Sequence, residues 1–190
     1  MKKDIILAGV GGQGILSIAA VIGVAAVESG LHLKQAEVHG MSQRGGDVQS
    51  HLRISDQAIS SDLIQQGRCD MILSVEPMEA LRYLHFLAPE GWLMTSSTPF
   101  DNIEAYPPVE DLFKEIRKVK NHRIVDASSI ARELGSQKVS NIVMLGVASE
   151  QLGISLESLK DAIGVLFGRK GEEMVKLNIS ALEAGRNALS

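Results

Sequence analysis

The chain has 190 residues, of which 45% are hydrophobic, 22% charged and 4% aromatic, and its formal net charge at pH 7 is −4. This length and apolar content suit one compact domain, and we expect residues 1–190 to form it. The acidic balance and the few aromatic side chains do not provide the basic surface that nucleic acids require, so no nucleic-acid partner is expected.

Strand-like and helix-like segments alternate through the first two thirds of the chain. Residues 4–8 are an apolar run typical of a buried strand, and residues 15–27 are an apolar helix shorter than the ~20 residues that a bilayer requires, so no membrane span is expected. Residues 33–39 and 48–55 read as strands, and the second alternates apolar and polar residues like a half-exposed antiparallel strand. Further strands are predicted at residues 71–75, 92–96 and 123–127, and helical stretches within residues 77–87, 107–118 and 127–135.

The last third of the chain is helical throughout. Helical segments are predicted within residues 140–153, 155–167 and 171–189, and Ser155 is a plausible N-cap of the second. The whole pattern predicts an α/β fold, an open Rossmann-like and mostly parallel sheet with an antiparallel hairpin-like segment and a helical C-terminal third.

The cysteine and histidine content limits the metal and redox sites that this chain can form. Cys69 is the only cysteine, so this chain cannot supply the four thiolates of an iron–sulfur cluster, a disulfide within the chain or a cysteine-type zinc site. The five histidines are scattered without metal-ligand spacing, and no bound metal is expected. Asp4 and the glycines that follow interrupt the apolar stretch after Met1, which argues against a signal peptide and favours a cytoplasmic protein.

A glycine-rich turn, AGVGGQGI at residues 8–15, joins the first strand to the first helix. Gly9, Gly11 and Gly14 match the G-x-G-x-x-G spacing of dinucleotide-binding turns, and the start of the following helix offers N–H groups to an anion. A P-loop ATPase or GTPase is not expected, because Ile15 and the next residue replace the Lys and Ser/Thr of that loop. The acid that should hold a ribose is also poorly placed, since Glu37 lies before the expected end of its strand. Three interpretations stay open: an NAD or FAD site, a tight turn, and a loop for a ligand shared with another chain.

A second unusual loop, HGMSQRGGD at residues 39–47, is longer than a tight hairpin requires. The N–H groups of Gly45 and Gly46 can converge on an anion, with the planar cation of Arg44 beside them. The alternative is a turn with a solvated Arg44. Glu76 also has two interpretations, because it can face the ligand crevice at the end of a strand or stabilise the start of a helix, and the second is favoured.

Four segments in this order resemble a known family: GVGGQG, EVHGMSQRGGDVQSHLRIS, EPMEALRYL and NIVMLGV. Together they are similar to the gamma-type domain of the 2-oxoacid (pyruvate/indolepyruvate) ferredoxin oxidoreductases, and most of all to the beta subunits of its indolepyruvate branch. The likeness covers nearly the whole chain.

The resemblance implies a subunit that is not catalytic alone. A large partner subunit would hold thiamine diphosphate, magnesium and the iron–sulfur clusters, and coenzyme A would bind near the interface. The complex would oxidatively decarboxylate an arylpyruvate to an acyl-CoA and CO₂ and reduce ferredoxin. Both loops would face the shared site, and the resemblance gives these residues a ligand-binding role: Gly9, Gly11, Gly12, Gln13, Gly14, Ser42, Gln43, Arg44, Gly45 and Gly46. A free-standing NAD(P)-binding reductase and a scaffold without a ligand of its own are the alternatives.

Overall fold

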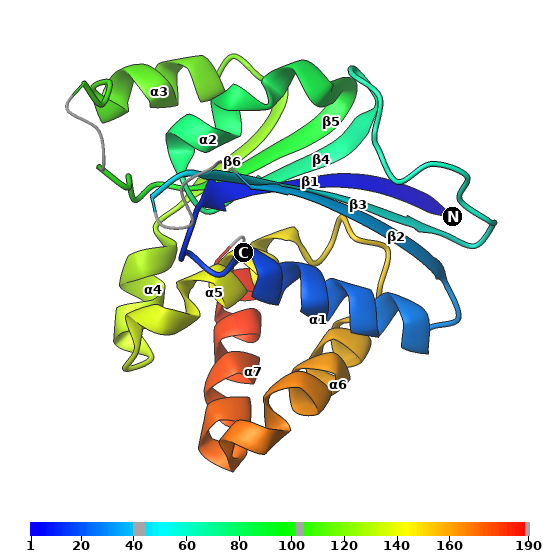
Figure 1. Ribbon diagram of the computed structural model, residues 1–190. Coiled ribbons are helices and arrows are strands. Elements are labelled where there is room, and N and C mark those ends of the chain that lie inside the picture. The colour runs from blue at the N-terminus through cyan, green and yellow to red at the C-terminus, as the bar shows by residue number, and fades with distance from the viewer. Residues whose placement is uncertain (40–44, 102–104, 189–190) are drawn as a thin grey trace.

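A computed structural model of the chain describes residues 1–39, 45–101 and 105–188. In this part of the chain, a six-stranded sheet has the order β2-β3-β1-β4-β5-β6. The helices α2 and α3 lie on one face of the sheet, and α1, α4, α5, α6 and α7 lie on the other (Figure 1).

The elements have the following bounds. The strands are β1 (Lys2–Val10), β2 (His32–His39), β3 (Asp47–Ser55), β4 (Cys69–Ser74), β5 (Leu87–Ser96) and β6 (Asn121–Val125). The α-helices are α1 (Ile15–Glu28), α2 (Pro77–Arg82), α3 (Val109–Ile116), α4 (Ala127–Glu133), α5 (Ser140–Ala148), α6 (Leu156–Phe167) and α7 (Glu172–Asn187). Three short 3₁₀ helices are η1 (Leu84–Phe86), η2 (Gln137–Val139) and η3 (Gly168–Lys170).

The first strand occupies the middle of the sheet. β1 pairs antiparallel with β3, with Val10 opposite Asp47, and parallel with β4, with Ala8 opposite Ser74. The carboxyl ends of β1, β4, β5 and β6, the end of β2 and the start of β3 therefore lie along one edge of the sheet, which we call the glycine-loop edge. The α/β fold class predicted from the sequence, including the antiparallel pair and the helical C-terminal part, is confirmed.

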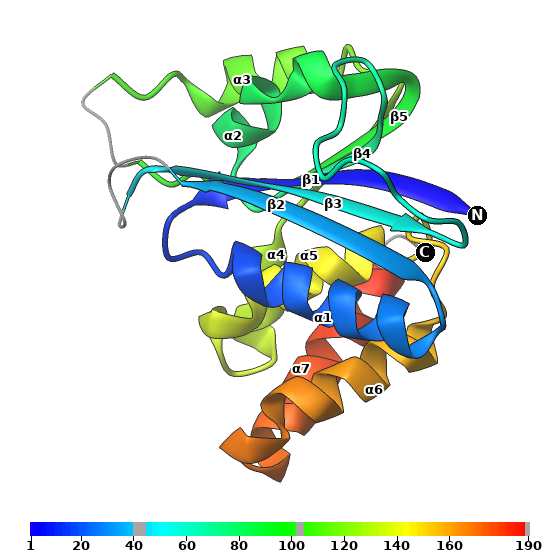
Figure 2. The same ribbon diagram turned by 45° about the vertical axis from the view of Figure 1, so that its right-hand side comes forward.

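The helical layer packs closely onto the sheet. α1 is apolar on nearly all sides because it lies between the sheet and α6, as Figure 2 shows. α5 and α7 approach so closely that a Cβ on Gly146 would lie 2.1 Å from the carbonyl oxygen of Leu182. A Cβ on Gly185 would lie 1.9 Å from the carbonyl oxygen of Val143. The two glycines thus allow the backbones of these helices to touch.

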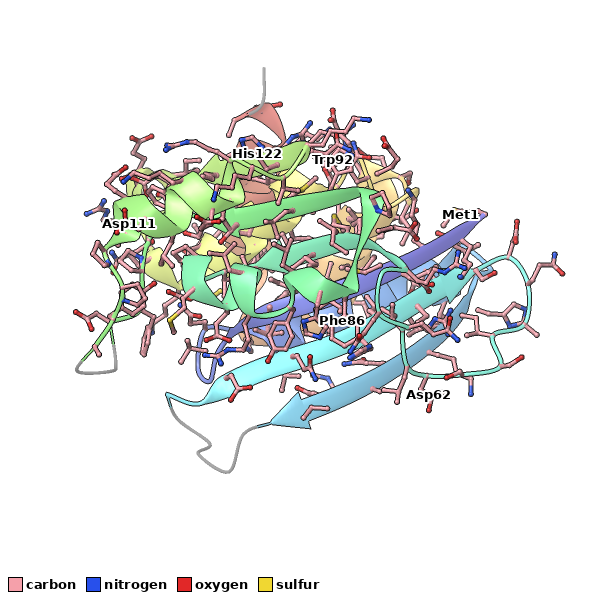
Figure 3. All side chains as sticks on the ribbon, turned by 90° about the horizontal axis from the view of Figure 1, so that it is seen from above. Met1, Asp62, Phe86, Trp92, Asp111 and His122 are labelled. Atoms are coloured by element: carbon pink, nitrogen blue, oxygen red, sulfur yellow. The ribbon has the colours of Figure 1, made fainter. Side chains whose placement is uncertain are left out.

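The opposite face carries a smaller core. Ile6, Ile72 and Leu93 are fully buried beneath α2 and its surroundings. The helix predicted within residues 77–87 is too long, because α2 ends at Arg82 and the chain continues as η1. Phe86, labelled in Figure 3, is the last residue of η1, and its ring lies edge-on to that of His51 of β3 with 5.2 Å between the ring centroids. Side-chain packing thus overrides helix propensity at this point. In the described residues, no helix is long and apolar enough to cross a membrane.

Candidate ligand-binding site

The turn from β1 to α1 uses its three fingerprint glycines in different ways. A Cβ on Gly9 would lie 2.6 Å from the side chain of Val75, and one on Gly14 would lie 2.4 Å from the Asn141 amide nitrogen. Gly14 also has φ +82°, a left-handed conformation that favours glycine. Gly11 donates its backbone N–H to the carbonyl oxygen of Gly46 at 2.8 Å. Two of the glycines therefore serve close packing, and the third joins the turn to the neighbouring hairpin.

The side chain of Gln13 forms a hydrogen bond within the turn. Its side-chain oxygen accepts the N–H of Val10 at 2.8 Å, which fixes the amide against the loop. Gly12 has φ +102°, and a Cβ there would meet no atom within 4 Å. Gly14 is the N-cap of α1 and offers no side chain to the N–H groups of the first helical turn. The turn is thus rigid, with one open glycine and a helix start without a side-chain cap.

Two cavities meet at Gln13. The first, the β4–β5 crevice of about 230 Å³, lies beyond the ends of these strands and is lined by Gln13, Val75, Ser96, Thr98, Pro99, Phe100, Ala127, Ser128, Gln137, Ser140 and Met144. The second, the lysine groove of about 450 Å³, is lined by Gly12, Gln13, Gly14, Ser17, Ser136, Lys138, Val139, Asn141, Phe167, Lys170, Met174, Leu177 and Asn178. The groove combines two lysines with an apolar floor, an arrangement suited to a ligand with anionic groups and an apolar part.

The described end of the second predicted loop, Gly45 and Gly46, lies at the same edge. The ligand-binding residues predicted at Ser42, Gln43 and Arg44 lie outside the described residues. Gly45 has φ +80°, and the carbonyl of Gly46 accepts the hydrogen bond from Gly11. The end of the hairpin is therefore held against the glycine turn, and the anion contact at Gly45 and Gly46 stays a prediction.

The strand order argues against a dinucleotide site. In a dinucleotide-binding fold, the acid that binds the ribose stands at the end of the second strand of a parallel βαβ unit, beside the first strand. Glu37 lies on β2, which pairs with β3, whereas the neighbours of β1 are β3 and β4. The glycine spacing is present here without its partner acid.

Glu76 stabilises the start of α2, as the favoured interpretation of the sequence predicts. Its carboxylate accepts the N–H of Glu79 at 2.8 Å and is completely buried. It also accepts a hydrogen bond from the hydroxyl of Tyr106. Burial, together with this negatively charged partner, raises the pKa of Tyr106 above its ordinary value, so the phenol keeps its proton.

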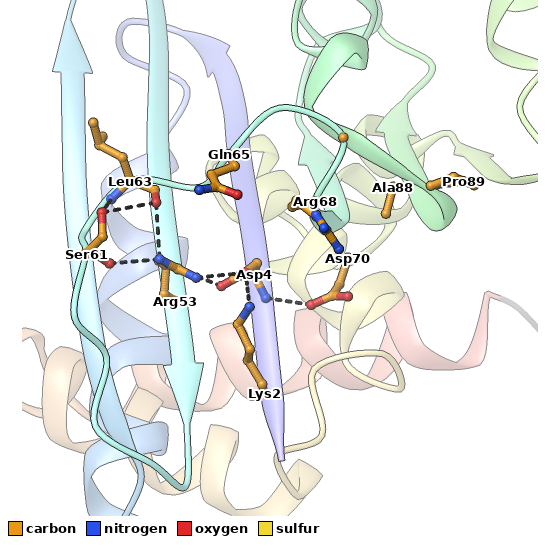
Figure 4. A pocket seen from close by; sticks show the side chains of 11 residues that line it. Lys2, Asp4, Arg53, Ser61, Leu63, Gln65, Arg68, Asp70, Ala88 and Pro89 are labelled. Carbon is orange, nitrogen blue, oxygen red and sulfur yellow. Dashed lines mark hydrogen bonds and ion pairs between the residues drawn. The ribbon is translucent and has the colours of Figure 1, made fainter.

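A further cavity, of about 650 Å³, lies at the opposite end of the sheet (Figure 4). Arg53 binds the carboxylate of Asp4 through two nitrogens at 2.7 and 3.1 Å, and Lys2 pairs with the same carboxylate at 2.8 Å. The remaining Arg53 nitrogen donates to the carbonyl oxygens of Ser61 and Leu63. Burial alone would raise the pKa of Asp4, but the two cations outweigh it and hold that pKa below its ordinary value. These charges satisfy one another, so we assign them a structural role.

The described His, Cys, Asp and Glu side chains do not form a metal site. Among the described residues, no group of three or more His, Cys, Asp and Glu side chains is placed to hold a metal ion. His51 is buried and accepts the N–H of Ile64 at 3.1 Å, and Cys69 is also buried.

Sequence comparison identifies the family. The model of the pyruvate ferredoxin/flavodoxin oxidoreductase family matches residues 4–188, and the chain belongs to this family. It is therefore a subunit of the 2-oxoacid ferredoxin oxidoreductase class. The chain is 36% identical over 196 residues to the indolepyruvate oxidoreductase subunit IorB of Archaeoglobus fulgidus, covering 98% of this chain and 95% of that protein. It is 29% identical to the 2-oxoglutarate synthase subunit KorC of Methanothermobacter marburgensis, covering 100% of this chain and 97% of that protein.

A solved structure shares the fold. The chain superposes on the 2-oxoglutarate:ferredoxin oxidoreductase of Magnetococcus marinus with a TM-score of 0.78 and 23% identity. That structure contains 2-oxoglutarate, coenzyme A and succinyl-CoA. The alignment covers 98% of this chain but only 31% of the other, so there the same fold is one part of a much longer chain.

Proposed function

We propose that this chain is the non-thiamine, cluster-free subunit of an indolepyruvate-type 2-oxoacid ferredoxin oxidoreductase, with residues 1–190 acting as one gamma-type domain. The similarity to IorB over nearly the full length of both chains carries the proposal. With a single cysteine, this chain cannot supply the four thiolates of an iron–sulfur cluster. The family resemblance implies that a larger partner subunit holds the clusters, thiamine diphosphate and magnesium.

The proposed reaction converts a 2-oxoacid, coenzyme A and two oxidised ferredoxins into an acyl-CoA, CO₂, a proton and two reduced ferredoxins. Thiamine diphosphate on the partner would supply the decarboxylation chemistry. We infer that this chain contributes to binding coenzyme A at the glycine-loop edge. Its lysine groove supports this role, because phosphates suit Lys138 and Lys170 while the pantetheine arm suits the apolar floor.

The test is reconstitution with the proposed large thiamine- and cluster-bearing subunit. We expect a stable complex that reduces ferredoxin with indolepyruvate faster than with 2-oxoglutarate, and little activity when this chain is left out. Failure to form a complex, or equal activity without this chain, would overturn the proposal. A preference for 2-oxoglutarate would overturn the assigned substrate and leave the subunit role intact.

Charge variants test the groove. Replacing Lys138 and Lys170 together by Ala should raise the KM for coenzyme A about tenfold or more, because a hydrogen bond to a charged group contributes about 1.5–3 kcal/mol. Lys118→Ala is the control. Lys118 is exposed, follows α3 and pairs with Glu115 of that helix, and it does not line the groove. At the hairpin, Arg44→Lys keeps the charge but removes the planar donor fork, so weaker binding in this variant would support a two-point contact to an anion.

A further inference from the structure

The carboxylate of Glu76 accepts hydrogen bonds from the segment after β5 as well as from the start of α2. One oxygen accepts the N–H of Glu79 at 2.8 Å. The other accepts the backbone N–H of Phe100 at 3.3 Å and the hydroxyl of Tyr106. The two oxygens thus face different parts of the chain, one the helix and the other the segment that leaves β5.

The choice of glutamate fits this double contact. Ser, Thr, Asp and Asn are the preferred N-cap residues, and their short side chains suffice to accept a first-turn N–H. Glutamate is one methylene longer than aspartate, which allows its second oxygen to reach partners 24 and 30 residues further along the chain. Ser74 fixes the backbone beneath it, because its hydroxyl donates to the carbonyl of Glu76 at 2.6 Å and accepts the N–H of Glu76 at 3.2 Å.

The segment that Glu76 holds forms one wall of the β4–β5 crevice. Thr98, Pro99 and Phe100 line this crevice together with Gln13 and Ser140. Phe100 is 39% exposed, although its backbone N–H donates a hydrogen bond to the buried carboxylate of Glu76. Glu76 itself does not line the crevice, so its influence on the crevice passes through the segment.

We propose that Glu76 is a positioning residue, whose carboxylate fixes the Thr98–Phe100 wall of the β4–β5 crevice and so shapes the mouth of the ligand site beside Gln13. This inference rests on the proposed function, because it takes the glycine-loop edge as the place where the complex binds coenzyme A. The structural half of the inference concerns the isolated chain alone.

Two variants separate the hydrogen bonds of Glu76. Tyr106→Phe removes one bond to the second oxygen and leaves the cap of α2 intact. Glu76→Asp keeps a good N-cap but withdraws the second oxygen from Phe100 and Tyr106. Ser155→Ala is the control, since it removes a helix cap of α6 remote from the crevice. It measures the effect of lower stability alone.

Hydrogen exchange on the isolated chain measures directly how well the backbone of the Thr98–Phe100 wall is protected. In Glu76→Asp, the amide of Phe100 should exchange at least about tenfold faster, while the amides of α6 keep their wild-type rates. Tyr106→Phe should give a smaller change in the same direction. Unchanged exchange at Phe100 in Glu76→Asp would overturn the proposal.

Steady-state kinetics of the reconstituted complex measure how the position of this wall affects coenzyme A binding. Glu76→Asp should raise the KM for coenzyme A by about 3-fold to 100-fold, while kcat stays within about twofold, because the wall borders a binding crevice and the decarboxylation is assigned to the partner subunit. Ser155→Ala should leave both constants at their wild-type values. Faster exchange at Phe100 with an unchanged KM would overturn the positioning role. If the wild-type complex shows no dependence on this chain, the proposed function itself has failed, which is a different result.

Discussion

Gly14→Ala is the most direct test of how the glycine turn is built. An alanine at φ +82° costs about 1–2 kcal/mol relative to glycine in the left-handed region. Its Cβ would lie 2.4 Å from the amide nitrogen of Asn141, which is 7% exposed and has little room to move. That nitrogen donates to the carbonyl oxygen of Gly14 at 3.0 Å, and losing this bond costs about 1 kcal/mol more. We expect a total loss of about 2–4 kcal/mol in the free energy of unfolding.

Gly12→Ala is the matched control. Gly12 also has a positive φ, +102°, but no atom lies within 4 Å of its would-be Cβ, so this variant bears the backbone strain alone. Gly14→Ala should therefore be at least about 1 kcal/mol less stable than Gly12→Ala, which corresponds to about 2–4 °C in Tm for a chain of this size.

Urea unfolding followed by the fluorescence of Trp92, the only tryptophan, measures both variants. In an Asn141→Ala background the amide is absent, and Gly14→Ala should then cost no more than Gly12→Ala. Equal costs of the two glycine variants in the wild-type background would refute the close-packing argument for Gly14.

Three further predictions concern buried groups. Asp4→Asn should lower the free energy of unfolding by about 3 kcal/mol, because Arg53 would lose a charged partner that is 1% exposed; a loss in urea unfolding below about 1 kcal/mol would contradict this. Burial, and secondly the charge of Arg53, lower the pKa of His51 below 6.5, so the folded chain resists protonation more than the unfolded chain. Stability should therefore fall as the pH drops below about 6.5, and His51→Gln should remove this part of the fall; identical pH profiles of Tm would show the reasoning to be wrong. Burial raises the pKa of Cys69 to about 12, so an aromatic disulfide reagent at pH 8 should label one thiol per chain in urea and almost none in the native state.

Local sequence patterns predict the elements of this fold well. Alternation in residues 48–55 indicates the antiparallel strand β3, Pro77 lies at the first position of α2, and Ser155 accepts the N–H of Ser158 as the cap of α6. Each of these features depends on residues close together in the chain. Patterns of this kind are visible in one sequence because period and capping are local properties.

The contacts that build the site are of another kind. Asn141 reaches Gly14 from 127 residues away, and Arg53 reaches Asp4 from 49 residues away. Asn141 is the second residue of the apolar helix α5 and begins the segment NIVMLGV, but no local pattern marks it as a partner of the glycine turn. The position of Glu37 away from β1 also depends on strand order, which no local pattern contains.

The antiparallel direction of β3 has a consequence for how this edge can change in evolution. The β2–β3 connection lies between two paired strands, and the pair of His39 with Val48 ends their register. An insertion in the connection can therefore be accommodated without altering the sheet, whereas an insertion in the glycine turn would displace α1 from β1 and from Asn141. The two connections at this edge thus differ in how freely their lengths can vary: the β2–β3 connection can change in length, whereas the glycine turn must keep its spacing.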